Sequence, residues 1–335
     1  MTDSHRACAE ACANIAFIKY WGNADEDLHW PANGSISMNL GALTTRTSVT
    51  FEPGLPADQL VIDGLQAGAG ELARISRFLN VVRQGAGVSW SARVESKNSF
   101  PRSAGLASSA SAFAALALAS THALGQELSE AQLSRLARLG SGSACRSVPG
   151  GFVEWDRGKR PQDSFARSLA PAGYWDLVDC IALVTAAPKL VSSLEGHRLA
   201  PTSPLQTARV GDAPRRIAAC RTALLTTDFL ALATISELDC RLMHAVMMTS
   251  SPPLLYWAPA TLAVIQAVQA ARQDGVAVFY TIDAGPNVHL ICPRSEVERV
   301  RSMLAQVPGI AQVLVSSAGG PARLIPNAEW SPGAP

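Results

Sequence analysis

The stretch PRSAGLASSASAFAALALA, residues 101–119, decides the fold, because a glycine and several small residues lead directly into an alanine-rich helix. We expect that helix to span residues 108–124 and to end at Gly125. Small residues let backbone amides approach an anion, and a helix start presents unpaired N–H groups. The hydroxyls of Ser108 and Ser109 add two donors. The pattern predicts a phosphate-binding loop, although it is also typical of a serine-capped helix that packs through its alanines.

A second loop of small residues, GSGSACRS at 140–147, has the same character. It brings Ser141, Ser143 and Arg146 into one short span. Such a loop is typical either of an anion site or of a glycine that ends a helix beside an exposed arginine. Two such loops in one chain favour a phosphate-rich site. A P-loop nucleotidase is disfavoured, because the Walker sequence GxxxxGK[ST] is absent.

Two charged residues stand at the ends of apolar segments. Lys19 follows the apolar run at 15–18, where an ordinary lysine would be a solvated strand end. Asp283 follows the apolar strand pattern at 276–282 and begins the turn DAGPN. Asp283 either stabilises that turn or is a carboxylate held on a rigid element and aimed into a cleft, as a base or an orienting group.

Local patterns divide the chain into a strand-rich first half and a helix-rich second half. In the first half, strands are expected at 13–19, 36–42, 45–51, 88–94, 151–155 and 178–185, and helices at 70–84, 108–124 and 128–140 with Ser129 as N-cap. In the second half, we expect helices within 205–250, at 259–273 and from 296, and strands at 276–282, 288–292 and near 313. A linker could occupy 156–175, or the strand at 178–185 could still belong to the first sheet. The fold class is therefore α+β.

Composition limits the possible partners. Of 335 residues, 48% are hydrophobic and 16% charged, so a large core is available and disorder is disfavoured. The net charge of +1 gives no electrostatic argument for nucleic acid or an anionic membrane. Seven scattered cysteines predict a reduced, cytoplasmic protein, and Cys8 and Cys12 lack the second ligand pair of a zinc site. No signal peptide, spanning segment or protein-bound metal site is predicted.

Together these motifs resemble the GHMP kinase superfamily and, within it, the mevalonate diphosphate decarboxylases, most closely a phosphomevalonate decarboxylase branch. The blocks NIAFIKYWG, GLASSAS, GSGSACRSVPGGFVEW, VSS, RLMHA and DAGPN are similar to decarboxylase signatures and occur in the family's order. The resemblance implies a two-domain GHMP kinase fold. Residues 1–186 would form a domain like ribosomal protein S5 domain 2, residues 187–325 a ferredoxin-like α+β domain, and residues 326–335 a frayed tail. A homodimer is the family-level expectation.

The same resemblance implies roles for individual residues. ATP, with Mg²⁺, would phosphorylate the 3-hydroxyl of a mevalonate derivative, and phosphate and CO2 would then leave an alkene. Asp283, Lys19 and Arg146 would be catalytic, and Arg146 would also clamp the substrate carboxylate. The other expected substrate-binding residues are Tyr20, Asn23, Ser141, Ser143 and Ser193. The expected ATP-binding residues are Asn98, Gly105, Ala107, Ser108 and Ser109.

The chain departs from the family pattern at two positions. Relatives typically carry a lysine where this chain has Asn23 and an arginine where it has Leu194. Losing two charge-assisted hydrogen bonds costs about 3–6 kcal/mol, or on the order of 10²–10⁴ in affinity. This favours mevalonate 5-phosphate over the 5-diphosphate. Arg198, one helical turn beyond Leu194, could instead restore the charge.

Three other functions stay open at this point. The chain could act on the diphosphate, could phosphorylate the 3-hydroxyl without decarboxylation, or could be a binding protein on the same fold. The presence of Asp283, Lys19 and Arg146 argues against the last two. His244, on a helix with apolar spacing, is expected to be a core histidine rather than a ligand.

Overall fold

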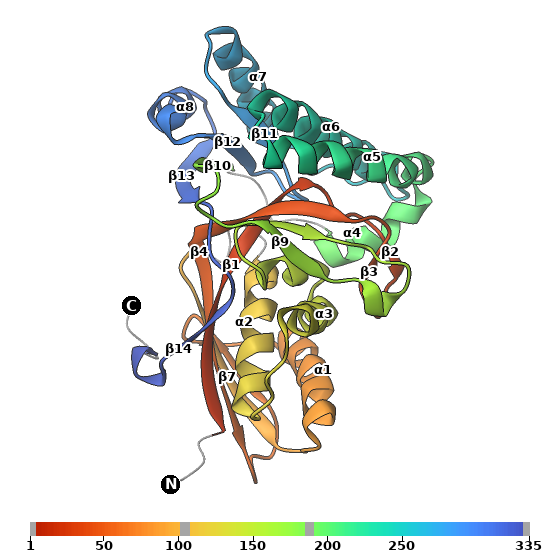
Figure 1. Cartoon of the computed structure of the whole chain (residues 1–335), viewed down its shortest axis with the longest axis vertical. Helices are drawn as coiled ribbons and strands as arrows, with labels where there is room; N and C mark the ends of the chain where they lie inside the picture. Colours follow the sequence, from red (N-terminus) through yellow and green to blue (C-terminus); the bar gives the residue numbers. More distant parts are fainter. Residues whose placement is uncertain (1–4, 101–107, 185–190, 331–335) are drawn as a thin grey trace.

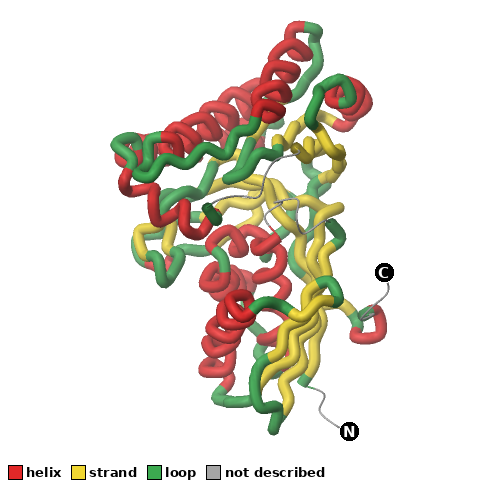
Figure 2. Tube along the Cα trace, turned by 180° about the vertical axis from the view of Figure 1, so that it is seen from behind, coloured by secondary structure: helices red, strands yellow, loops and turns green. Residues whose placement is uncertain are grey.

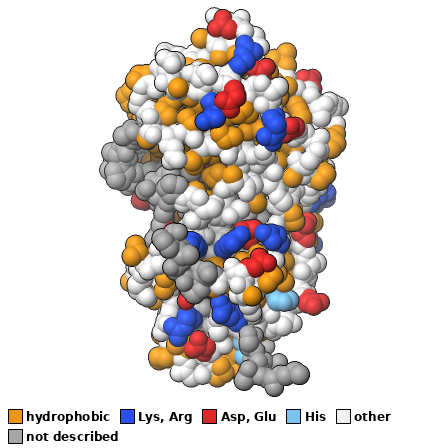
Figure 3. Space-filling model, turned by 90° about the vertical axis from the view of Figure 1, so that its left-hand side faces the viewer, with side chains coloured by type: hydrophobic (Ala, Val, Ile, Leu, Met, Phe, Trp, Pro, Cys, Tyr) orange, Lys and Arg blue, Asp and Glu red, His pale blue; other side chains and the backbone are white. Residues whose placement is uncertain are grey.

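The computed structural model describes residues 5–100, 108–184 and 191–330. Two main β-sheets, each covered by helices, lie one above the other along the long axis of the molecule (Figure 1). No helix among the described residues is long and apolar enough to cross a membrane. On the face shown in Figure 3, basic and acidic side chains are interspersed.

The first sheet has eight strands, in the order β14-β1-β4-β7-β5-β6, with β8 on β4 and β9 on β8. These strands are β1 (Arg6–Ile18), β4 (Ser35–Glu52), β5 (Gln59–Ile62), β6 (Leu65–Gln66), β7 (Ser91–Asn98), β8 (Phe152–Trp155), β9 (Ala166–Ala170) and β14 (Arg323–Ile325). A separate two-stranded ribbon joins β2 (Asn23–Asp25) to β3 (Trp30–Pro31).

The first sheet differs from the prediction in several strands: β5, β6, β9 and β14 were not predicted, β9 lies within the stretch 156–175 where a linker was considered, and β1, β4 and β7 have other bounds than expected. The strands expected at 36–42 and 45–51 form one continuous strand, β4, because Gly41 makes no turn. A Cβ there would lie 3.3 Å from Gly319 Cα, so the glycine serves close packing. β1 begins at Arg6, earlier than expected. The prediction missed its first half because that half contains several alanines, which have weak strand propensity. The strand expected at 88–94 is β7, which starts and ends later.

Helices α1 (Ala69–Ala86), α2 (Ser108–Ala123) and α3 (Glu130–Gly140) cover one side of the first sheet (Figure 2). α2 is buried along most of its length, since its alanines let it lie directly against β1 and β4. The expected N-cap of α3 is confirmed, because Ser129 Oγ accepts a hydrogen bond from Gln132 N. A Cβ on Gly140 would lie 1.9 Å from the Phe113 ring, so only glycine allows α3 to end against α2.

The second sheet is antiparallel, in the order β11-β12-β10-β13. Its strands are β10 (Leu177–Val184), β11 (Phe279–Thr281), β12 (Val288–Pro293) and β13 (Ile310–Ser317). The helices of this half are α4 (Ser193–Leu199), α5 (Gln206–Leu225), α6 (Phe229–Met248), α7 (Pro259–Gln273) and α8 (Val297–Leu304). β11 is shorter than the strand expected at 276–282, because it is an edge strand that pairs only with β12.

The sheets do not follow the expected division at residue 186. β10 precedes that point, yet it pairs with β12 and β13 and not with the first sheet. β14 follows it, yet it pairs with β1. In the described part of the expected tail, residues 326–329 are exposed, while Trp330 is buried and its Nε1 donates to Glu95 Oε2 over 3.1 Å.

One hydrophobic core joins the two halves. Residues of β1 and β4 share it with residues of β10, α5, α6 and β11. Thr281 Oγ1 also donates to the backbone oxygen of Ala16 over 3.1 Å, which fixes β11 beside β1. The chain just after β1 and the chain just after β11 are therefore held together, and these two segments carry Lys19 and Asp283.

Candidate active site

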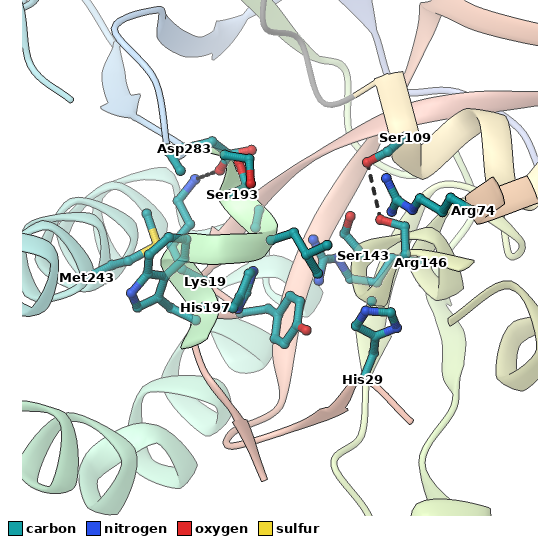
Figure 4. Close-up of a pocket in the computed structure, with 18 residues that line it drawn as sticks. Lys19, His29, Arg74, Ser109, Ser143, Arg146, Ser193, His197, Met243 and Asp283 are labelled. Carbon is teal, nitrogen blue, oxygen red and sulfur yellow. Dashed lines mark hydrogen bonds and ion pairs between the residues drawn. The ribbon is translucent and has the colours of Figure 1, made fainter. Parts of the chain in front are cut away.

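A cavity of about 280 Å³ lies where elements of both halves meet. In Figure 4, Lys19 and Asp283 point toward one another at one side of it, and Ser109 and Arg74 lie at the other. Eight of the residues predicted for the site line this cavity: Lys19, Tyr20, Ser109, Ser141, Ser143, Arg146, Ser193 and Asp283.

The first group in the cavity is an ammonium–carboxylate pair. Lys19 Nζ lies 2.6 Å from Asp283 Oδ1. The Lys19 side chain is 2% exposed and that of Asp283 is 40% exposed, so the carboxylate is the member open to a ligand. Burial raises the pKa of Asp283, but the Lys19 charge, with His289 and Arg146, outweighs it and holds the pKa below its usual value. An ionised carboxylate of this kind can orient a hydroxyl and accept its proton.

A buried ionic network holds the backbone of Lys19. Asp239 Oδ2, from α6, accepts a hydrogen bond from Lys19 N over 2.6 Å, and Arg209 Nη2, from α5, donates to Lys19 O over 2.8 Å. Asp239 Oδ1 also accepts from Arg216 Nε over 2.6 Å. Arg209, Arg216 and Asp239 are all buried. The second half of the chain therefore fixes the position of a lysine that belongs to the first half.

Arg146 is buried rather than exposed, with 4% of its surface accessible. It lies on a short 3-10 helix, Gly142–Ser147, directly after α3. Its Nε and Nη2 donate to Asn14 Oδ1, and its Nη1 donates to Ser35 Oγ. These bonds use three of the five guanidinium N–H groups and leave one on each terminal nitrogen. Gly140 does end α3, but the alternative that the arginine beside it is exposed is wrong.

At the other side of the cavity, the start of α2 meets the loop that follows α3. Ser109 Oγ, in the first turn of α2, lies 3.2 Å from Ser141 Oγ. Arg74 of α1 donates from Nη2 and Nε to Gly140 O, which holds its guanidinium beside both serines. This side of the cavity thus combines hydroxyl groups, a helix start and a guanidinium. Groups of these kinds bind phosphate in proteins.

A third part of the cavity, around Tyr20 and Leu194, has no charged side chain of its own, and Arg146 of the neighbouring 3-10 helix lines the cavity beside it. Tyr20 Oη donates to Asn23 Oδ1, and Asn23 Nδ2 donates to Glu26 Oε2 over 3.0 Å. Leu194 lines the cavity. Arg198 does not line it, and its side chain is 64% exposed with Nε 3.9 Å from Glu26 Oε2. The prediction that Arg198 could restore a cation beside Leu194 therefore finds no support in the geometry.

His197 of α4 lies among the rings of this uncharged part. Its ring centroid is 4.2 Å from that of Tyr20 and 4.6 Å from that of Trp21. Its Nδ1 accepts a hydrogen bond from Gly22 N over 2.9 Å. Burial, with nearby basic groups, lowers its pKa to about 3, so the ring is neutral near pH 7.

Some predicted residues are not brought to the cavity. Asn98 is engaged elsewhere, since its Oδ1 accepts from Thr45 Oγ1 and its Nδ2 donates to Asp63 Oδ2. Ser108 precedes Ser109 on α2 but does not line the cavity, and neither does Asn23. Gly105 and Ala107 lie outside the described residues. His244 is buried, with Nε2 3.3 Å from Ile282 O, as expected for a core histidine.

Sequence reasoning missed several residues of the site. Asn14, which holds Arg146, stands in the same block as Lys19 and could have been found there. Arg74 and Asp239 gave no signal, because each reads as an ordinary solvated residue of a helix. No group of three or more metal-ligating side chains occurs among the described residues.

Two family profiles match successive parts of the chain. The diphosphomevalonate decarboxylase-like N-terminal domain matches residues 11–166. The mevalonate 5-diphosphate decarboxylase C-terminal domain matches residues 180–321. These ranges contain the sequence blocks described above and every described residue of the cavity.

Individual relatives match over most of their length. A diphosphomevalonate decarboxylase of Ganoderma lucidum is 36% identical over 90% of this chain and 82% of its own. A phosphomevalonate decarboxylase of Haloferax volcanii is 32% identical over 97% of this chain and 99% of its own. The relatives therefore include both substrate preferences.

Solved structures agree with the fold. Mevalonate diphosphate decarboxylase from Staphylococcus aureus superposes with a TM-score of 0.93 at 37% identity, over 96% of this chain and 98% of its own. A complex described as MDDEF with MVAPP, AMPPCP and magnesium superposes with a TM-score of 0.91 at 38% identity, over 96% of this chain and 98% of its own. The expected GHMP kinase fold is confirmed.

Proposed function

The chain belongs to the mevalonate diphosphate decarboxylase family and is a decarboxylase of mevalonate diphosphate or phosphate, and from that premise we propose that its substrate is mevalonate 5-phosphate. The product would be isopentenyl phosphate, with ADP, phosphate and CO2, in isoprenoid synthesis by a mevalonate pathway. The alternative is the 5-diphosphate, which would give isopentenyl diphosphate. A 3-hydroxyl kinase without decarboxylation is a weaker alternative.

One observation carries the choice of the monophosphate. The wall of the cavity at Tyr20 and Leu194 lacks the two cations of the family pattern, since Asn23 and Leu194 are uncharged and Arg198 is exposed on the outside, while Arg146 and Arg74 line the cavity beside this wall. Two missing charge-assisted hydrogen bonds are worth about 3–6 kcal/mol, or on the order of 10²–10⁴ in affinity. The extra negative charge of a diphosphate would meet two fewer cations than the family pattern provides, whereas a monophosphate needs less.

The remaining groups suit both steps of the reaction. Asp283 would orient the 3-hydroxyl and accept its proton as the oxygen attacks the γ-phosphorus of ATP. Lys19 would stabilise the negative charge that develops on the transferred group. The two free N–H groups of Arg146 would bind the substrate carboxylate until the 3-phosphate leaves and the C–C bond to CO2 breaks. Ser141, Ser143 and Ser193 would contact the substrate with neutral donors.

The cavity also suits ATP and Mg²⁺. The start of α2 with Ser109, the hydroxyl of Ser141 and the guanidinium of Arg74 would hold the phosphates. Magnesium prefers oxygen ligands, which the phosphates and these hydroxyls provide, and when bound it would neutralise phosphate charge. A homodimer and a cytoplasmic location stay predictions from the resemblance and the cysteine content.

The test is a side-by-side assay with mevalonate, its 5-phosphate and its 5-diphosphate, in which ADP and CO2 are both measured. We expect the highest kcat/KM with the 5-phosphate and equal amounts of ADP and CO2. A higher kcat/KM with the 5-diphosphate would establish the alternative substrate, and ADP without CO2 would establish a kinase.

A double substitution tests the physical reason. Asn23→Lys with Leu194→Arg should raise the kcat/KM ratio of diphosphate to monophosphate by at least tenfold, because it returns two charge-assisted hydrogen bonds. Leu230→Arg, at a side chain that is 74% exposed, adds charge away from the cavity and serves as the control. An unchanged ratio in the double variant would contradict the cation argument.

A further inference from the structure

The hydrogen-bond pattern of His197 fixes which of its nitrogens carries the proton. Nδ1 accepts from the backbone N–H of Gly22, so the neutral ring must hold its proton on Nε2. No described residue accepts a hydrogen bond from Nε2, and this atom is not among the buried polar atoms that lack a partner. Because His197 lines the cavity, its Nε2–H is a donor that remains available to a ligand there.

Two glycines make this placement possible. A Cβ on Gly196 would lie 2.6 Å from the Trp21 ring, so only glycine lets α4 approach that ring closely enough to bring His197 beside Tyr20. Gly22 has a φ of +88°, a conformation that other residues rarely adopt, and in this conformation its N–H reaches His197. The backbone at Gly22 and at Gly196 thus holds the His197 ring in one orientation.

The neighbours of the ring determine what it can bind. Tyr20 packs against one part of it and also lines the cavity. Leu194, three residues earlier on α4, lines the same wall and offers no hydrogen bond. Serine hydroxyls of the loop after α3 and of the start of α4 add neutral donors to this wall, and Arg146 of the same loop also lines the cavity.

We propose that His197 is a specificity-determining residue, whose Nε2–H donates a hydrogen bond to the 5-phosphoryl group of the substrate. This inference rests on the proposed function, because it assigns the 5-phosphoryl group to the uncharged part of the cavity. A neutral donor contributes less than a cation would, and it cannot offset the additional charge of a diphosphate. The residue therefore supports binding of one phosphoryl group while giving no advantage to a second.

The decisive variant is His197→Asn. The asparagine Oδ1 can still accept from Gly22 N, but the side chain no longer reaches the position of Nε2. We expect KM for mevalonate 5-phosphate to rise about five- to tenfold, which corresponds to the loss of one hydrogen bond. We expect kcat at saturating substrate and KM for ATP to change by less than about twofold.

A purely structural role would give a different result. If His197 only packs the wall, His197→Asn should lower kcat and raise both KM values together, and that result would overturn the proposal. His122→Asn, at an exposed position on α2, makes the same chemical change away from the cavity and should leave all three parameters unchanged.

A second variant, His197→Arg, separates this inference from the proposed function. It should raise kcat/KM for the 5-diphosphate relative to the 5-phosphate about tenfold or more, because a cation replaces a neutral donor. Preference of the unchanged enzyme for the diphosphate would overturn the proposed function, while the KM effect of His197→Asn would still support the contact. Preference for the monophosphate with no KM effect in either variant would overturn only the role of His197.

Discussion

The two parts of the cavity are built in opposite ways. Around Lys19 and Asp283, charged groups lie in contact and several are fully buried. Around Tyr20 and His197, aromatic rings pack at a tilt and the His197 ring accepts a hydrogen bond from a backbone N–H. The difference supports the proposed substrate, because charged groups surround Lys19 and Asp283 whereas the positions of Asn23 and Leu194 lack the cations of the family pattern.

The two parts also differ in what they require from the rest of the molecule. A buried charge is unfavourable unless it is paired and hydrogen-bonded, so Lys19 depends on Asp239 and Arg209 from helices of the other half. The neutral part requires only close packing of rings and two glycines. Substitutions should therefore be severe in the charged part and mild, but selective, in the neutral part.

The largest effect is expected from Asp283→Asn. The amide cannot accept the proton of the 3-hydroxyl, and general-base groups of this kind contribute about 10²–10⁴ in rate. CO2 release should therefore fall by about a thousandfold or more, while ATP binding measured by calorimetry changes little, because the phosphate site lies at the other side of the cavity.

Asp176→Asn is the matched control for this substitution. Asp176 is also an aspartate paired with a basic residue, but its side chain is 65% exposed and its partner is Arg294 on the surface. The Asp176→Asn variant should release CO2 at the rate of the unchanged enzyme. Near-normal CO2 release by Asp283→Asn would refute the role of Asp283 and, with it, the contrast between the two parts.

The next effect concerns stability and tests whether the charged part depends on buried pairing. Asp239→Asn removes the partner of Arg216, whose side chain is fully buried, and weakens the contact to Lys19 N. Breaking a buried pair by removing one partner costs about 3–5 kcal/mol. The free energy of unfolding in urea should fall by that amount, and kcat should fall because Lys19 is less well placed.

Asp212 provides a matched comparison on α5, because it contacts the same Arg216 through Nη1 over 2.8 Å from a partly exposed position. Asp212→Asn should change stability only slightly, since water can replace its contact. Equal losses for the two variants would mean that burial of the network is unimportant.

Sequence alone predicted the elements with strong local signals. The alanine-rich helix, the serine cap of α3 and the order of strands and helices in the second half were all predictable from periodicity and caps. The first half of β1 was not, because alanines carry little strand propensity and are fixed there by pairing with β4 and by the helix that covers them. The continuity of β4 through Gly41 likewise depends on the approach of Gly319.

In the site, too, the residues that depend on tertiary contacts could not be predicted from the sequence. Unusual local patterns made it possible to find Lys19, Asp283 and the serines Ser109, Ser141 and Ser143, and the structure brings these residues to one cavity. Asp239 and Arg209 could not, because only the tertiary fold turns these helix residues inward against Lys19. Arg198 and His197 are neighbours in sequence, yet one points to solvent and the other into the cavity, and no periodicity argument separates them.

The smallest effect is expected from Arg198→Ala, which tests whether the wall around Tyr20 and Leu194 lacks a cation. The side chain is 64% exposed and its Nε is 3.9 Å from Glu26, so the pair contributes less than about 1 kcal/mol. We expect the kcat/KM ratio of monophosphate to diphosphate to change by less than about twofold, measured beside His197→Arg as the positive control. A strong loss of diphosphate activity in Arg198→Ala would show that this arginine turns inward when substrate binds. Arg198 would then place a cation at the wall around Tyr20 and Leu194 in the working enzyme.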